Sequence, residues 1–404
     1  MADPRRPARR SSGVSKWRVL GLGVVGLAAA LTVAAVAAPD RAGRAAARYT
    51  PDDAAQVITR VPTREAAELS ARRVLTEGDQ ASAVQLAKLE LGRYRRFSDP
   101  RYLGRAQALL ARWWKEPSPP ADVLLLRATI RQAVHEFPAA RADLDALIAA
   151  RPEDVNAQLT RAVVATITAD YAAARESCTA LAARPLIEAT CLAPVEGIAG
   201  RADAAYAKLR ALLPARTEPA IEAWALTALA ELAIMRGDPA AETHLRDALE
   251  LDPDDAYARG LLFDVLFEAN RKGEASKLLE RREDDDALLV RLAISEHALR
   301  STDAARLAGL MRDKIAAAAQ RGDRIHLREE ARFALLVDRD FPRAIQLARD
   351  NWDVQKELAD ARLLVEAAVA GGDRVAAAPV LAWMTATGVR DAWLDARVRT
   401  LEPR

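Results

Sequence analysis

ADVLLLRATIRQAVHEFPAARADLDALIAARPEDVNAQLTRAVVATITADYAAARESCTAL, residues 121–181, contains one pattern of small and bulky apolar residues twice. The first copy consists of Ala128, Phe137, Ala140, Leu144 and Leu147, and the second of Ala162, Tyr171, Ala174, Cys178 and Leu181. The copies are 34 residues apart, a period that is typical of arrays of helix hairpins. The pattern therefore indicates repeats rather than one globular core.

The same spacing occurs twice more toward the C-terminus. Ala241 and Leu245 recur as Ala275 and Leu279. A further set, Phe341, Ala344, Leu347 and Ala348, recurs as Val375, Ala378, Leu381 and Ala382. Three pairs with one period are hard to obtain by chance in a helical chain.

Short polar turns separate apolar stretches of helical length between these positions. The turns are Glu77-Gly78-Asp79, Ser98-Asp99-Pro100, Arg151-Pro152-Glu153-Asp154, Arg236-Gly237-Asp238, Asp252-Pro253-Asp254-Asp255 and Gly371-Gly372-Asp373. Proline ends one helix there, and an acidic residue caps the next. Such short turns require antiparallel hairpins. We predict an all-α chain with about 14 to 17 helices in residues 63–404 and no sheet.

The pattern resembles that of the tetratricopeptide repeat family. That family has a small residue within its first helix, a bulky residue after the turn, alanine three positions later and a closing proline. Residues 128–152 fit through one unit, and Ala162, Tyr171, Ala174 and Leu181 fit the next. Looser units follow at Gly200, Ala205, Leu209 and Leu212, and at Ala241, Leu245, Ala248 and Pro253. The resemblance covers roughly residues 121–387 and implies a right-handed superhelix that binds other proteins or peptides.

The inner face of the first helices is where this family binds its partners. Members that bind acidic tails carry Lys, Asn and Arg there. In this chain the corresponding positions are Asp122, Leu125, Thr129 and Gln132, followed by Asn156, Leu159, Val163 and Thr166. These residues form no cationic clamp and predict a neutral, partly apolar groove for a helix or an extended peptide.

The N-terminal region contains a candidate membrane span. Residues 19–38 form an uncharged run about as long as a helix needs to cross a bilayer. Arg5, Arg6, Arg9, Arg10, Lys16 and Arg18 precede the run, whereas Arg41, Arg44 and Arg48 follow it. This bias predicts a cytoplasmic tail at residues 1–18 and a single-pass protein of the bacterial inner membrane with periplasmic repeats. The alternative is a cleaved signal peptide, because Ala35-Val36-Ala37 has the small-x-small form of a cleavage site. The product would then be exported and soluble.

The domain order that we expect after the span is simple. Residues 39–62, with Pro39, Pro51 and Pro62, form a linker. Residues 63–120 form an irregular helical cap that ends at the proline-rich break 116–120. Residues 121–404 hold the repeats. Residues 1–48 contain nine basic and two acidic residues, so the rest of the chain is mildly acidic. We expect no nucleic-acid partner, since no basic cluster falls on the folded body.

Cys178 and Cys191 are the only cysteines and lie on either side of Pro185. In an antiparallel hairpin they would sit at matching height, which suggests a disulfide in an oxidising compartment. The alternative is a pair of small buried core residues.

No motif for catalysis or cofactor binding stands out. The four histidines lie far apart in sequence, no CxxC or HxxxH occurs, and we expect neither a metal nor a cofactor. The acidic run 283–286 is interpreted as a solvated turn that caps a helix beginning near Ala287. Six of the seven tryptophans, at 113, 114, 224, 352, 383 and 393, are interpreted as fillers of the array ends rather than as docking anchors.

We therefore expect a membrane-tethered scaffold without catalytic activity, for envelope protein assembly, secretion or maturation. Two alternatives are an exported all-α enzyme acting on glycans and a periplasmic regulator. An aromatic content of 5% argues against the first, because sugar sites stack their ligands on aromatic rings. Only 18 residues precede the span, which leaves little room for a cytoplasmic effector.

Overall fold

A computed structural model describes residues 79–213, 217–321 and 326–401. Within these ranges the chain contains helices and turns but no strand, so the predicted all-α class is confirmed. The predicted tail, membrane span and linker (1–18, 19–38 and 39–62) lie outside the described residues, as does the start of the cap at 63–78. None of the described helices combines the length and the hydropathy that a membrane span requires.

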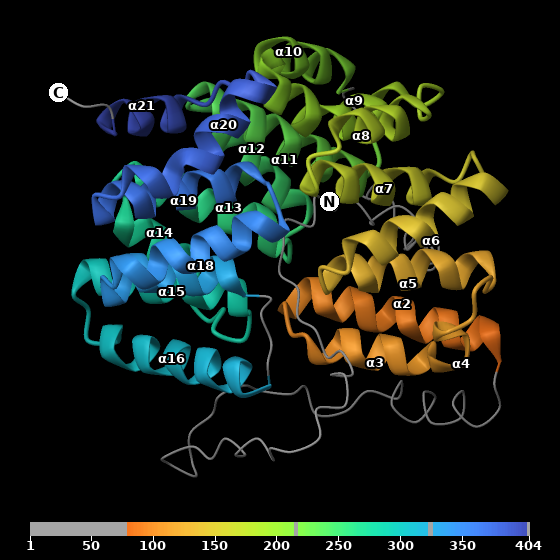
Figure 1. The fold of residues 1–404 in the computed structure, drawn as a ribbon, viewed down its shortest axis with the longest axis horizontal. Coiled ribbons are helices and arrows are strands. Elements are labelled where there is room, and N and C mark those ends of the chain that lie inside the picture. The colour runs from red at the N-terminus through yellow and green to blue at the C-terminus, as the bar shows by residue number, and fades with distance from the viewer. Residues whose placement is uncertain (1–78, 214–216, 322–325, 402–404) are drawn as a thin grey trace, which may run out of the picture.

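The N-terminal helices form one limb of the molecule, on the right in Figure 1. In order they are α2 (Gln80–Phe97), α3 (Arg101–Leu109), α4 (Ala111–Trp114), α5 (Ala121–Ala133), α6 (Phe137–Ala150), α7 (Val155–Ile167) and α8 (Tyr171–Thr179). Consecutive helices pack as antiparallel pairs, for example α5 with α6 and α7 with α8.

The middle helices cross the top of the same view. They are α9 (Pro185–Glu196), the π-helical turn η2 (Gly197–Arg201), α10 (Ala202–Leu212), α11 (Pro219–Arg236) and α12 (Ala240–Leu251). In α11, alanine and larger apolar residues occur on every face of the helix. The helix is therefore buried along most of its length and packs on both α12 and α9.

The C-terminal helices form the second limb, which descends and then returns upward on the left of Figure 1. The descending part is α13 (Ala256–Glu268), α14 (Lys272–Leu278), α15 (Asp286–Leu299), α16 (Ala304–Arg321), α17 (Leu327–Phe333) and η3 (Ala334–Asp338). The returning part is α18 (Phe341–Val354), α19 (Leu358–Gly371), η4 (Arg374–Ala377), α20 (Ala378–Thr387) and α21 (Ala392–Thr400). The described residues thus contain twenty α-helices, α2 to α21, more than the 14 to 17 expected. The excess comes from short segments such as the four-residue α4 and the seven-residue α17.

Acidic residues cap the helices at the predicted turns. Asp154 accepts a hydrogen bond from the backbone N–H of Ala157 at 3.0 Å, and Asp255 accepts one from Ala258 at 3.0 Å. Each carboxylate satisfies a backbone donor that has no partner within the helix. Asp285 caps α15 in the same way, but its side chain is only 2% exposed. The interpretation of this turn as a solvated one is therefore wrong at Asp285.

The core consists of the predicted repeat positions in most of the array. Ala128, Ala140 and Leu144 are fully buried, and so are their counterparts Ala174 and Cys178. These small residues let neighbouring helices approach closely. Ala241, Leu245, Ala275 and Leu279 are buried as well.

In the last predicted pair of repeats, the second copy, which begins at Val375, does not have the predicted register. Val375 is 75% exposed and Ala378 is exposed, whereas Ala376 and Ala377 are fully buried. The cause is the 3₁₀ turn η4. A 3₁₀ turn has three residues rather than 3.6, so it rotates the following side chains away from the phase of an α-helix.

The array turns back on itself, so that early and late helices touch. The backbone N–H of Lys356 donates to the carbonyl oxygen of Ile167 at 2.8 Å, and Trp383 Nε1 donates to the Tyr171 hydroxyl at 2.7 Å. At the end of α2, Ser98 Oγ donates to Asp285 Oδ2 at 3.2 Å. These contacts join residues that are more than 180 positions apart in sequence. The inner face of the repeats is therefore partly enclosed.

Candidate functional site

A cavity of about 600 Å³ lies between the two limbs. Its walls come from α2, α5, α7, α9, α11, α13, α15, α17, α19 and α21, together with the turns before α13 and α19. This volume falls within the roughly 300–1,000 Å³ of typical ligand sites. The cavity is the inner face of the repeats, closed by the returning C-terminal helices.

Four of the seven predicted groove residues line this cavity. They are Thr129, Gln132, Val163 and Thr166. Leu125, Asn156 and Leu159 are not in its lining, and the two leucines pack into the apolar core of α5–α9. The hydroxyls of Thr129 and Thr166 each donate to a carbonyl oxygen one helical turn earlier, at 2.8 Å. This wall is therefore neutral.

Fifteen charged residues also line the cavity, which the sequence analysis did not anticipate. Nine carboxylates line the cavity: Glu231, Asp252, Asp254, Asp255, Asp264, Glu268, Glu329, Glu357 and Glu366. Six guanidinium groups accompany them: Arg95, Arg96, Arg291, Arg328, Arg332 and Arg362. Carboxylates are in excess, so the cavity as a whole is acidic.

One part of this charged wall is internally neutralised. Asp264 on α13 accepts hydrogen bonds from Arg291 at 2.8 and 3.1 Å and from Arg332 at 2.7 Å. Burial alone would raise the pKa of Asp264, but the two guanidinium groups hold it well below its usual range. Arg362 lies 3.8 Å from Glu268 and also binds Asp391 at 2.7 Å. This network fixes α13, α15 and α17 relative to one another.

A second buried network surrounds Arg328 on α17. Its guanidinium donates to Asp360 at 2.6 and 2.8 Å and to Glu357 through a very short bond. Asn351 Nδ2 also donates to Asp360 at 2.6 Å. Although burial opposes its charge, the neighbouring carboxylates raise the pKa of Arg328 well above its ordinary value. This network attaches the loop between α18 and α19 to the cavity wall.

Glu231 is the carboxylate with the most unusual environment. It lies within the apolar helix α11 and accepts a hydrogen bond from the Tyr257 hydroxyl on α13. Burial, with a smaller contribution from the charges of Glu357 and Asp255, raises the pKa of Glu231 to about 7. Perturbed carboxyl groups of this kind are common at functional sites. The hydrogen bond from Tyr257 opposes the shift without cancelling it.

Aromatic residues complete the lining. Trp224, Tyr257, Tyr94 and Trp393 all contribute to the cavity. The interpretation of the tryptophans as fillers fits Trp352 and Trp383, which are buried and pack edge to face with their ring centres 5.4 Å apart. Trp224 and Trp393 are partly buried, line the cavity and also pack against the apolar core.

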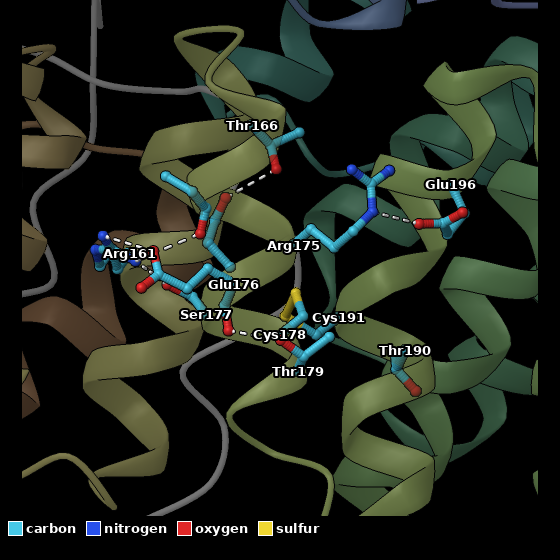
Figure 2. The surroundings of a disulfide bond; sticks show 12 residues. Arg161, Thr166, Arg175, Glu176, Ser177, Cys178, Thr179, Thr190, Cys191 and Glu196 are labelled. Atoms are coloured by element: carbon cyan, nitrogen blue, oxygen red, sulfur yellow. Dashed lines mark hydrogen bonds and ion pairs between the residues drawn. A yellow bond between two sulfur atoms is a disulfide. The ribbon is translucent and has the colours of Figure 1, made fainter.

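The two cysteines are joined by a disulfide with a Cα–Cα distance of 5.5 Å. Figure 2 shows that it connects α8 with α9, close to the ion pair between Arg175 and Glu196 at 2.9 Å. Both half-cystines are buried in the core of this hairpin. They do not line the cavity, so their role is structural.

Stacked antiparallel helix pairs that curve around an inner surface are an all-α architecture similar to that of tetratricopeptide repeat proteins. Residues 239–294, from α12 into α15, match the family model of the tetratricopeptide repeat. Repeats of this class bind proteins. None of the curated protein sequences matches the chain.

Among solved structures, the chain is similar to one from the crystal structure of the APC/C hetero-tetramer Cut9-Hcn1. The sequence identity is 13%, and the similarity covers 83% of this chain and 86% of that chain with a TM-score of 0.28.

Proposed function

We propose that the chain is a non-catalytic scaffold that holds a peptide segment of a partner protein in the cavity between its limbs. The observation that carries this proposal is the enclosed inner face, to which both the neutral wall of α5 and α7 and the charged wall of α11–α19 contribute. A helix or an extended segment matches such a groove, because its side chains can reach both walls at once.

We further propose that residues 19–38 tether the protein to the bacterial inner membrane and that the repeats, arranged as a right-handed superhelix, work on the periplasmic side. The basic residues before Val19 support this orientation. The Cys178–Cys191 disulfide supports an oxidising compartment. In that location the scaffold would serve assembly, secretion or maturation of exported proteins.

Site-specific photo-crosslinking in cells tests the binding role. Thr129→p-benzoylphenylalanine places the reactive group in the cavity, whereas Thr179→p-benzoylphenylalanine places it on the exposed end of α8 as a matched control. We expect defined protein adducts from position 129 and none of the same adducts from position 179. Equal adducts from both positions, or hydrolysis of cell-wall glycans by the purified chain, would overturn the proposal.

A reporter that is active only after export tests the location. Fused after Arg404, it should be active, and the protein should stay with membranes after an alkaline wash, because a spanning helix is held by apolar burial. Release of a species that begins at Ala38 or Pro39 would replace the anchor by a signal peptide. An inactive reporter would contradict the periplasmic location.

A further inference from the structure

The excess negative charge of the cavity is concentrated around Glu231, Glu329 and Glu357. The network of Asp264 and Glu268 already contains Arg291, Arg332 and Arg362, and Arg332 also interacts electrostatically with Glu329. Arg328 is the guanidinium that binds Glu357, and it is shared with Asp360. Hence more carboxylates than cations meet at this place.

Three polar atoms of the cavity lining have no hydrogen-bond partner among the described residues. They are Glu357 Oε1, the Tyr94 hydroxyl and Trp224 Nε1. Glu357 is only 8% exposed, so its free oxygen is withdrawn from bulk water. A buried polar atom without a partner costs free energy, and in a native chain such atoms require an explanation. Two of these atoms, on Glu357 and Tyr94, are able to accept hydrogen bonds.

Tyr94 on α2 and Glu329 on α17 line the cavity from opposite limbs. Burial and then the charges of Glu329, Asp285 and Asp286 raise the pKa of Tyr94 well above its ordinary value, and the neighbouring Arg95 offsets only part of this shift. Glu231 stands on α11, Glu329 on α17 and Glu357 in the turn before α19. With Tyr257 on α13, residues from five segments of the chain therefore line one acidic, aromatic-walled space.

An inorganic cation does not match this arrangement. Among the residues that the structure describes, no three His, Cys, Asp or Glu side chains are close enough to hold a metal ion. A larger organic cation reaches acceptors that are further apart, and its alkyl stem packs against aromatic rings.

We propose that the wall formed by Tyr94, Glu231, Tyr257, Glu329 and Glu357 binds the charged group of a lysine or arginine side chain presented by a partner peptide. This inference deepens the proposed scaffold function and rests on it. The ammonium or guanidinium group donates to the free oxygen of Glu357, to the Tyr94 oxygen and to Glu231. The neutral wall at Thr129, Val163 and Thr166 takes the apolar remainder of the peptide.

Titration of Glu231 gives this binding a pH dependence. The groups that face Glu231 are Tyr257 and Asp255 from α13 and its cap, and Glu357 from the turn before α19, with Arg328 next to Tyr257 and Glu357. Its pKa of about 7 leaves it partly protonated at neutral pH. A lysine side chain stays charged to about pH 10. Binding therefore strengthens as Glu231 loses its proton between about pH 6 and pH 8.

Three labelled pentapeptide amides test the proposal against the purified full-length chain. Each peptide has the sequence acetyl-Ala-Ala-X-Ala-Ala, where X is lysine, norleucine or glutamate. We expect the lysine peptide to bind at least tenfold more tightly than the norleucine peptide and the glutamate peptide to bind most weakly. The preference for lysine should grow from pH 6 to pH 8.

Three variants assign the preference to this wall. Glu231→Gln keeps an acceptor for Tyr257 but removes the charge, and it should abolish the pH dependence and reduce lysine binding several-fold. Tyr94→Phe should weaken binding of the lysine peptide and leave binding of the norleucine and glutamate peptides unchanged. Glu153→Gln, in the exposed turn before α7 and outside the lining, is the matched control and should change nothing.

The outcomes separate this inference from the scaffold proposal. Equal binding of all three peptides, or a lysine preference that survives Glu231→Gln and Tyr94→Phe together, overturns the cation site. Defined cross-links from position 129 would leave the scaffold function in place in that case. Absence of those cross-links contradicts the scaffold itself.

Discussion

Arg328→Met should destabilise the chain strongly, because it leaves buried carboxylates without their cation. Arg328 is 8% exposed in its side chain, and its partner Asp360 has no exposed surface. The variant removes three charge-assisted hydrogen bonds, of which those to Asp360 measure 2.6 and 2.8 Å. Methionine fills much of the same volume, so the loss is mainly electrostatic.

The magnitude follows from the burial of the network. Breaking a buried ion pair by removing one partner costs about 3–5 kcal/mol, since the remaining charge stays desolvated. Domains have net stabilities of about 5–15 kcal/mol, so this loss is a large fraction of the total. An exposed pair contributes only about 0–1 kcal/mol.

Arg306→Met is the matched control, because Arg306 also bridges two carboxylates. It binds Glu283 at 2.8 Å and Asp303 at 3.1 Å, but its side chain is 50% exposed. Urea unfolding followed by tryptophan fluorescence and by circular dichroism measures both variants. Urea is preferred to guanidinium chloride because it does not screen charges, and two probes are needed because repeat arrays can unfold in parts. A loss for Arg328→Met below about 1 kcal/mol, or equal to that for Arg306→Met, would refute the reasoning.

Three further predictions concern stability. Glu231→Gln should stabilise the chain at pH 8 by up to about 3 kcal/mol and have no effect near pH 4, as urea unfolding at each pH will show. The folded-state pKa of Glu231, about 7, lies above the pKa of a glutamate in the unfolded chain. The contribution of protonated Glu231 to the free energy of unfolding is therefore complete at low pH and is lost as pH rises through 7. Replacing Cys178 and Cys191 together by serine should cost about 3 kcal/mol under oxidising conditions, the chain-entropy value for a loop of this length. A reducing agent should then lower the stability of the parent chain by a similar amount and leave the variant unchanged. Gly200→Ala should lower the melting temperature clearly more than Gly388→Ala. Both glycines have positive φ, but a Cβ at Gly200 would meet the carbonyl oxygen of Gly388 at 2.4 Å, whereas one at Gly388 meets nothing within 4 Å. Similar shifts for the two alanine variants would contradict the close approach.

Local sequence rules were sufficient to predict the helices and most of the residues that form their core. Alanine and leucine at a fixed period specify which faces two helices share, and acidic residues after proline specify where a helix begins. Both rules act over a few residues, so they are visible without knowledge of the tertiary structure. They failed at Val375, where a 3₁₀ turn changes the phase of the pattern.

The charged wall of the cavity could not be derived in the same way, because it depends on which helices meet after the array curves. Nothing in the sequence indicates that Tyr94 and Glu329 line the same cavity. A partial signal was nevertheless present: Glu231 and Asp264 are single acidic residues within otherwise apolar stretches of α11 and α13. Charged residues are almost never fully buried unless they are paired, so an acidic residue in an apolar stretch is a signal for a buried polar site.

The contacts between the ends of the array also limit how the protein can change in evolution. An open repeat protein gains or loses a unit at little cost, because each unit touches only its neighbours. Here an inserted hairpin between α8 and α18 would displace Lys356 from Ile167 and Trp383 from Tyr171. We therefore expect relatives of this chain to keep its number of repeats and to vary by substitution, and to fold more slowly than open arrays, because the closing contacts are distant in sequence.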